Sequence, residues 1–177
     1  MSDEDVSSLV AYMNTLPPVR NAVPKPEIEF PVSMLYKGAP RPAGSVSAVN
    51  RADKLQYGQY LVNMAGCAEC HTPFEKGSPV AGMEFAGGHV FEIHGGPKVL
   101  SANITSDKAT GIGSWDLARF KERLAAYRDY DRNGSPQVGP ERFTLMPWLN
   151  FSRLTDEDVE AIWEYIRRRP AITNMVN

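Results

Sequence analysis

The sequence has only two cysteines, no long apolar run and no stripe of basic residues. No stretch approaches the ~18–20 apolar residues of a membrane span, so we expect no span in this chain. The net charge is −2 and the pI is near 5.9, which gives no reason to expect nucleic acid as a partner. The one basic run, residues 167–169, ends a predicted helix, where cations complement the helix dipole.

The first residues also lack a secretory signal, because they are acidic and show neither a basic n-region nor an apolar h-region. The 177 residues are 42% hydrophobic and 23% charged, which is typical of a globular protein of one domain plus an extra segment. Apolar spacing predicts helices over 52–66, from Ser114 as N-cap to 130, and over 156–169. The Gly-rich residues 76–101 predict a short hairpin around 89–93.

The chain begins with a copy of its end. Residues 1–19 match residues 154–172 at a constant offset of 153, and both begin with a capped acidic turn. Each copy then carries an apolar stripe, formed by Val6, Leu9, Val10 and Met13 in the first and by Val159, Ile162, Trp163 and Ile166 in the second. We therefore expect two helices that bury the same face.

Residues 17–42 hold seven of the fourteen prolines, so this segment is expected to be extended. It carries more large apolar residues than a free tether, which favours a strap laid on a surface. These residues are Ile28, Phe30, Met34, Leu35 and Tyr36.

The motif Cys67-Ala-Glu-Cys70-His71 is the strongest chemical signal in the chain. C-x-x-C-H is the attachment sequence of c-type haem. Two thiols three residues apart reach the two vinyl groups of one porphyrin, and the next residue places its imidazole under the iron. The sequence therefore predicts one covalently bound haem c, with His71 as an axial ligand.

The cysteine pair has three alternative interpretations. A structural zinc site needs about four ligands, and nothing in such a site places a histidine directly after the second cysteine. A thioredoxin-like dithiol opens a helix after a strand, whereas this pair ends a predicted helix. A structural disulfide or an accidental match is the third alternative.

The sixth iron ligand is predicted to be Met146, which precedes Pro147 in an irregular stretch before the last helix. Pro147 prevents helix there, so the side chain can point inward from a loop. Met64 is instead expected to face the core, and His89 or His94 is the alternative ligand. If Met146 is not on the iron, the chain is a haem enzyme or gas-sensing domain with an open or bis-His iron.

A helix running into the haem motif, a downstream Met-Pro and a closing helix with Tyr165 resemble a class I cytochrome c over residues 51–172. The resemblance implies an all-α fold with a small β-hairpin insertion, here with an extra N-terminal helix and an extended linker. In that family the first and last helices cross at a small residue, which implies Gly58 against Tyr165 or Trp163.

A second resemblance is to a narrower group of proteins. It rests on the string Asn103-Ile-Thr-Ser-Asp107, followed by Thr110-Gly-Ile-Gly-Ser-Trp115 and preceded by Ala86–Gly88. It is similar to the cytochrome subunits of membrane-bound dehydrogenases of alcohols, aldehydes or sugar acids, which carry haem domains in tandem. The resemblance implies that Asn103 and Trp115 reach the haem propionates. It also implies an electron carrier, not an enzyme, between a dehydrogenase donor and a cytochrome or oxidase acceptor.

The tandem arrangement explains the copied ends. Residues 1–16 are expected to be the last helix of a preceding haem domain, 17–50 a linker, and 51–172 the cytochrome domain. An export signal is then expected upstream, and the location periplasmic. The apolar stripe of residues 1–16 is expected to dock on this domain or on a neighbouring chain to form a dimer.

The carbonyls of Pro79 and Pro97 are the candidates for orienting His71. Residues 129–134 match the first half of an EF-hand loop, but Pro140 occupies the position of the bidentate glutamate, which favours an Asn-Gly turn.

Overall fold

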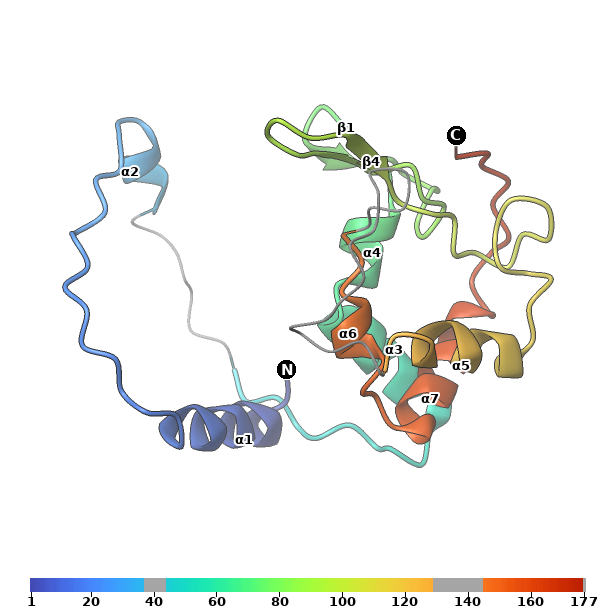
Figure 1. The fold of residues 1–177 in the computed structure, drawn as a ribbon, viewed down its shortest axis with the longest axis horizontal. Helices are drawn as coiled ribbons and strands as arrows, with labels where there is room; N and C mark the ends of the chain where they lie inside the picture. Colours follow the sequence, from blue (N-terminus) through green and yellow to red (C-terminus); the bar gives the residue numbers. More distant parts are fainter. Residues whose placement is uncertain (37–43, 129–144, 177) are drawn as a thin grey trace. The chain divides into compact units, whose positions relative to one another are not determined.

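The chain consists of two compact units, Met1–Val49 and Asn50–Asn177. The structure, a computed structural model, describes residues 1–36, 44–128 and 145–176 (Figure 1). The EF-hand-like residues 129–134 lie outside this range. No helix among the described residues is both long and apolar enough to cross a membrane.

The first unit contains helix α1 (Asp3–Asn14), as predicted. Ser2 caps it: the Ser2 hydroxyl accepts from the Asp5 N–H at 3.2 Å and donates to the Asp5 carboxylate at 2.8 Å. Asp3 then ties the helix to the far end of the linker, since its carboxylate accepts from Ser45 Oγ at 2.6 Å and from Val46 N–H at 3.0 Å. The start of α1 is thus bonded to residues 45 and 46, which follow the Pro-rich segment.

The Pro-rich segment is extended over residues 17–29, and a short helix, α2 (Val32–Tyr36), follows Pro31. This helix was not predicted. Phe30 and Met34 are 77% and 65% exposed, so no described residue of this unit covers them. The stripe of α1 is similarly open, with Val6 45% and Met13 59% exposed.

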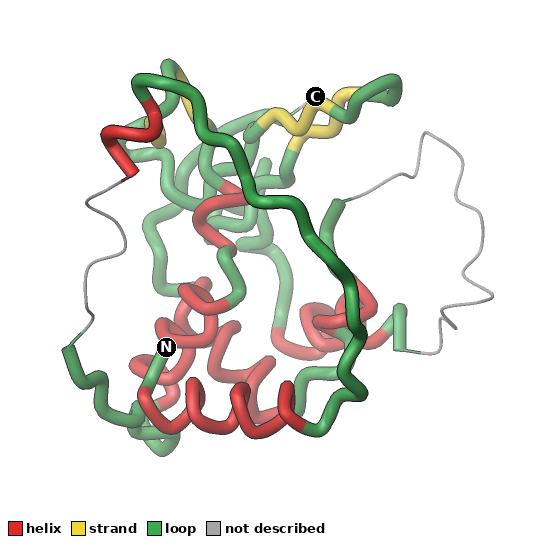
Figure 2. The backbone as a smooth tube through the Cα atoms, turned by 90° about the vertical axis from the view of Figure 1, so that its left-hand side faces the viewer, coloured by secondary structure: helices red, strands yellow, loops and turns green. Residues whose placement is uncertain are grey.

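The second unit is built on two crossing helices, α3 (Lys54–Met64) and α7 (Asp156–Ile166) (Figure 1). Figure 2 shows the helices in red and the strands in yellow. Asp53 caps α3, and Thr155 with Asp158 forms the capping box of α7. The helices approach closely at Gly58, where a Cβ atom would lie within 2.6 Å of the Ala161 carbonyl carbon. It would also lie 3.0 Å from Tyr165 Cβ.

The core of the second unit lies around this crossing. Its buried side chains come from α3, α7 and the loops between them: Val62, Phe85, Ile112, Ile162, Trp163, Tyr165 and Ile166. Met64 is 41% exposed, so the prediction that it faces the core is wrong. The buried face of α3 is the one that contains Gly58, and Val62 lies one turn further along that face.

Helix α5 (Leu117–Ala125) packs on α7 and on the short helix α6 (Trp148–Phe151). The predicted N-cap, Ser114, is wrong by two residues. Asp116 caps α5 by accepting from Arg119 N–H at 2.8 Å, while Trp115 N–H donates to Ile112 O in a preceding turn. Leu124 is buried, whereas Leu117, Phe120 and Tyr127 are half-buried.

Two antiparallel hairpins complete the unit. The predicted hairpin pairs β3 (Val90–Glu92) with β4 (Lys98–Leu100), with Phe91 opposite Val99. A smaller hairpin, β1 (Phe74–Glu75) with β2 (Ser78–Pro79), was not predicted. It directly follows the cysteine motif.

Glu160 on α7 joins three helices, because its carboxylate bonds Lys54 of α3 at 2.6 Å and Lys121 of α5 at 2.8 Å. The hydrogen bonds from Lys121 and Lys54 lower the pKa of Glu160 to about 2. A lowered folded-state pKa stabilises the protein above pH 4.5, and this stabilisation is lost as the pH falls toward 2.

We therefore predict that Glu160→Gln flattens the loss of stability between pH 4.5 and pH 2. Urea unfolding at several pH values measures this slope. Glu157→Gln, an exposed change on the same helix, is the control and is expected to leave the slope unchanged. Equal slopes for wild type and Glu160→Gln would contradict the prediction.

Candidate functional site

The cysteine motif forms its own short helix, α4 (Cys67–His71), directly after α3. Gly66 joins the two helices with φ +65°, a left-handed conformation that favours glycine. Cys67 packs against the core, whereas Cys70 is exposed, and both thiols are free. Burial, followed by the neighbouring Cys70 and Glu69, raises the pKa of the Cys67 thiol to about 11. Cys67 is thus held as a neutral thiol, and both cysteines lie on one short helix.

The imidazole of His71 is held by a main-chain carbonyl. Its Nδ1 lies 2.7 Å from Ala102 O, and since a carbonyl only accepts, Nδ1 carries the proton and Nε2 keeps its lone pair. Burial lowers the pKa of His71, although the bond to Ala102 opposes this, so the neutral ring is favoured. The orienting carbonyl is therefore neither Pro79 nor Pro97.

The main chain of His71 is held as well. Gly87 N–H donates to His71 O at 2.7 Å, and Gly88 N–H donates to Ser101 O at 2.8 Å. Gly87 has φ +74°, and a Cβ atom on it would lie 2.5 Å from Ala102 C. The glycines of the Ala86–Gly88 motif thus allow two segments to meet beside His71.

Asn103 lies at the centre of a buried loop and is 4% exposed. Its Oδ1 accepts from Thr105 N at 2.9 Å and Thr105 Oγ1 at 2.7 Å. Its Nδ2 donates to Thr110 Oγ1 at 3.0 Å and to Ile172 O at 2.8 Å. Both amide hydrogens are therefore bonded within the protein, and the contact of Asn103 with a propionate stays a prediction. In the structure, these four hydrogen bonds of Asn103 hold the loop together.

Trp115, the other residue predicted to reach a propionate, lies just before α5 and packs against the core. The guanidinium carbon of Arg119 lies 4.8 Å from the centre of its ring. The indole is thus fixed between the core on one side and a cation on the other.

Met146 is half-buried and lies in the irregular stretch before α6, as predicted. Its carbonyl accepts from Trp148 N–H at 2.8 Å. Trp148 stacks on Tyr127 with 4.9 Å between ring centres, and Arg123 lies 4.5 Å above the Trp148 ring. These contacts anchor the backbone that carries Met146 to α5.

The alternative ligands His89 and His94 belong to the hairpin region. His89 lies between Phe74 and Phe91, with ring centres 5.2 Å and 4.5 Å away. Its main chain exchanges hydrogen bonds with Ser101, next to the carbonyl that holds His71. His94 is exposed in the turn between β3 and β4.

The residues present fit a covalently bound haem. Two free thiols and an imidazole with an unprotonated Nε2 form the donor set that thioether attachment and iron ligation require. The Trp148 Nε1 atom is buried without a partner among the described residues, so it can donate to a group in this region. No three His, Cys, Asp or Glu side chains gather as metal ligands within the described residues.

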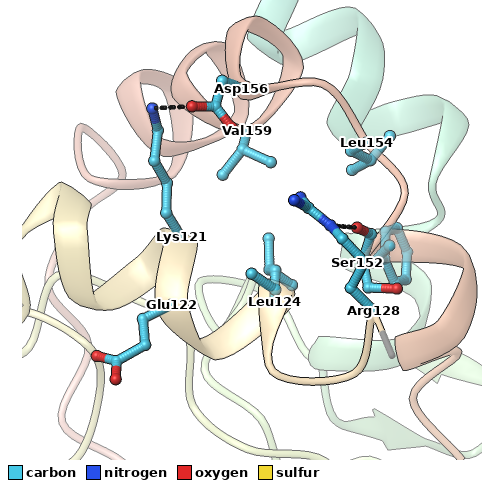
Figure 3. A pocket seen from close by; sticks show the side chains of 10 residues that line it. Lys121, Glu122, Leu124, Arg128, Ser152, Leu154, Asp156 and Val159 are labelled. Atoms are coloured by element: carbon cyan, nitrogen blue, oxygen red, sulfur yellow. Dashed lines mark hydrogen bonds and ion pairs between the residues drawn. The ribbon is translucent and has the colours of Figure 1, made fainter. Parts of the chain in front are cut away.

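A separate pocket of about 190 Å³ lies between α5 and the α6–α7 segment (Figure 3). Leu124 and Val159 line it, and Lys121 and Arg128 are engaged at its edge with Asp156 and Ser152. Its lining contains none of the predicted site residues.

Several residues near the motif were missed by sequence reasoning. Ala102 contributes a carbonyl, which no side-chain pattern signals. Trp148 and Arg123 form a stack across two elements, and Asn174 bonds the Ala86 carbonyl at 3.0 Å from a distant part of the chain. Only the glycine pair of Ala86–Gly88 gave a signal that two segments approach closely here.

Comparison with known proteins agrees with this geometry. The family model "Cytochrome c" matches residues 55–169. The fructose dehydrogenase cytochrome subunit of Gluconobacter japonicus is 32% identical over 126 residues, which are 71% of this chain and 23% of that protein. A diheme cytochrome c-type protein of Cereibacter sphaeroides is 33% identical over 178 residues, which are 96% of this chain and 55% of that protein.

A third relative is the cytochrome c subunit of the quinone alcohol dehydrogenase of Gluconobacter oxydans, 28% identical over 184 residues. These cover 97% of this chain but 37% of the relative. The chain therefore spans between about a quarter and about half of the length of these relatives. With the family model covering residues 55–169, which include the attachment motif, the chain belongs to the cytochrome c family.

Proposed function

We propose that this chain carries single electrons on one haem c, bonded to Cys67 and Cys70 and ligated by His71 and Met146. The observation that carries the proposal is the presentation of the C-x-x-C-H motif. Both thiols are free on α4, and Ala102 holds His71 Nδ1 so that Nε2 is left for iron. When bound, the haem supplies an iron that gains and loses one electron.

The residues of the chain keep the imidazole in one orientation and one tautomer. The carbonyl of Ala102 accepts the Nδ1 proton, which raises the basicity of the ligating nitrogen. Burial favours the neutral ring that binds metal. Both effects favour stable ligation through a change of redox state, as an electron carrier requires.

Met146 is favoured over His89 as the second axial ligand because of where His89 lies. The main chain of His89 pairs with Ser101, adjacent to the carbonyl that holds His71, so His89 belongs to the His71 side. Met146 instead comes from the stretch before α6, which is anchored to α5 through Trp148. A thioether ligand raises the reduction potential and suits electron transfer.

The relatives indicate the class of redox partner. Their names describe cytochrome subunits of fructose and quinone-dependent alcohol dehydrogenases. We propose that this chain accepts electrons from a dehydrogenase and passes them to a further cytochrome or an oxidase. Because haem c is attached outside the cytoplasm, the proposed location is the periplasm.

Met146→Leu tests the ligand assignment. The substitution keeps the volume of the side chain but removes the sulfur, so the sixth iron position is expected to open. We predict that the ferrous variant binds CO within mixing time, whereas the wild type does not without denaturation. Met83→Leu is the matched control and is expected to behave as wild type. Rapid CO binding by the wild type would instead support a haem enzyme or gas sensor.

We also propose that α1 is the counterpart of α7, and therefore a terminal helix of the cytochrome c type. Gly58 of α3 meets Ala161 and Tyr165 of α7. At the offset of 153, α1 carries Ser8 and Tyr12 at these two places, again a small residue and a tyrosine. Residues 1–16 are thus suited to pack across a glycine of a helix like α3.

A graft tests this equivalence. Replacing residues 155–166 by the sequence of residues 2–13 is expected to preserve folding and methionine ligation, with a lower Tm. The same graft with Ser8→Leu is the control, and it is expected to fail because Gly58 leaves room only for a small residue. Failure of the first graft, or equal success of both, would contradict the proposal. Thermal unfolding and the ferric spectrum are the measurements.

A further inference from the structure

The chain continues after α7 as a tail, residues 169–174, that is bonded to the loop containing Asn103. Side chains of the loop hold two of its carbonyls: Ser106 Oγ donates to Arg169 O at 2.7 Å and Asn103 Nδ2 to Ile172 O at 2.8 Å. The tail returns bonds to the loop, since Asn174 N–H donates to Thr110 Oγ1 at 3.0 Å. The tail is therefore part of the structure around the motif.

His71 is held at two points, and neither holder is a side chain. The Ala102 carbonyl holds its ring at 2.7 Å, and the Gly87 N–H holds its main-chain carbonyl at 2.7 Å. Main-chain groups have no freedom of their own, so their positions depend on what fixes the segments that contain them.

The tail fixes both of these segments. Ile172 O is bonded to Asn103, the residue directly after Ala102. Asn174 Nδ2 donates to Ala86 O at 3.0 Å, directly before Gly87. Ile172 and Asn174, two residues apart in the tail, thus bond the sequence neighbours of Ala102 and Gly87, the two residues that hold His71. Asn174 links the two segments. Its side chain bonds Ala86, and its main-chain N–H bonds Thr110, whose hydroxyl accepts from Asn103.

We propose that the tail residues 172–174 position His71 by bracing its two main-chain holders, with Asn174 as the positioning residue. The inference rests on the proposed function, in which His71 ligates the haem iron. Weaker bracing lets the Ala102 carbonyl move from Nδ1, which lowers the basicity of the ligating nitrogen. The reduction potential is then expected to rise, because a less basic ligand stabilises ferric iron less.

Asn174→Ala tests the proposal in the ferrous holoprotein. It removes the side-chain bonds to Ala86 O and Gly87 O and leaves the main-chain bond to Thr110. The loosened segment is bonded through Gly88 N–H to Ser101 O, directly before Ala102, so the change reaches both holders of His71. We expect the His71 Nδ1 proton to exchange with deuterium about tenfold faster, measured by NMR, since one lost hydrogen bond has an effect of that order. The reduction potential is expected to rise in the same variant.

Thr173→Val is the matched control. It removes one hydrogen bond from the same tail, the 3.0 Å bond of Thr173 Oγ1 to Asp107, a residue that is not a sequence neighbour of either holder of His71. Nδ1 exchange and potential are expected to stay at wild-type values there. If Asn174→Ala yields no folded holoprotein, Asn174→Ser is measured in its place.

Two results would overturn the inference. One is unchanged Nδ1 exchange in the Asn174 variant, and the other is an equal change in both variants, which would indicate a general loss of stability. Failure of the proposed function is distinguishable, because wild-type protein would then show no histidine-ligated haem and no Nδ1 signal at all.

Discussion

Gly58→Ala is expected to destabilise the protein by about 3 kcal/mol or more, although it places a better helix former inside α3. The new methyl group would overlap the main-chain carbonyl of Ala161 and would lie 3.0 Å from Tyr165 Cβ. Neither obstacle is the end of a flexible side chain, so α3 and α7 must separate. Since these helices form the core crossing, the whole domain is affected.

Guanidinium unfolding of the holoprotein, followed by far-UV circular dichroism, measures this loss. Gln59→Ala is the control, because Gln59 is the exposed neighbour on α3. Helix propensity alone predicts a gain of up to ~1 kcal/mol for Gly58→Ala. A stabilised Gly58→Ala protein would therefore mean that α3 and α7 do not cross at this residue.

Asn103→Ala is expected to cost about 3 kcal/mol. The side chain is 4% exposed and takes part in four hydrogen bonds, so its loss leaves the buried Thr105 N–H in need of a partner and takes one of two donors from Ile172 O. Each unsatisfied buried group costs roughly 1–3 kcal/mol. The same unfolding experiment measures the effect.

Asn63→Ala, an exposed change on α3, is the control and is expected to stay within ~0.5 kcal/mol of wild type. The experiment also separates two roles for Asn103. A residue that only held a propionate would alter the pH dependence of the potential with little loss of stability. A loss of less than about 1 kcal/mol would therefore contradict the loop-organising role.

The helices could be predicted where the residues that define their ends lie close together in the sequence. The capping box of α7 lies within four residues, Thr155 to Asp158, and the structure contains it. The start of α5 was predicted two residues early because both Ser114 and Asp116 can cap a helix. The choice depends on the turn at Ile112–Trp115, which requires Gly113 to lie against Ser106 O.

The buried face of α3 was harder to predict, because its centre is a glycine. Apolar spacing pointed to Met64, whereas the contact with α7 is made at Gly58 and continues at Val62. A residue without a side chain adds nothing to an apolar pattern, even where it decides how closely two helices approach. The buried face of α3 is therefore set by the close approach to α7 at Gly58, and not by the spacing of apolar residues.

Contributions that do not come from a side chain also limited what could be predicted of the site. Cys67, Cys70 and His71 were visible because the chemistry needs those side chains at that spacing. Ala102 was not, because its contribution is a carbonyl, which every residue has. The role of Asn174 depends on a tail that returns from 103 residues beyond His71, a contact that no local pattern reports.

The most direct test of the electron-carrier account is the absorption spectrum of protein matured with a haem-attachment system, followed by acid–acetone extraction. We predict that the haem stays with the polypeptide through Cys67 and Cys70. We also predict that the ferric form shows the weak long-wavelength band of methionine-to-iron ligation. Haem that passes into the acetone phase would contradict covalent attachment, and a stable ferric form without the band would remove Met146 from the iron.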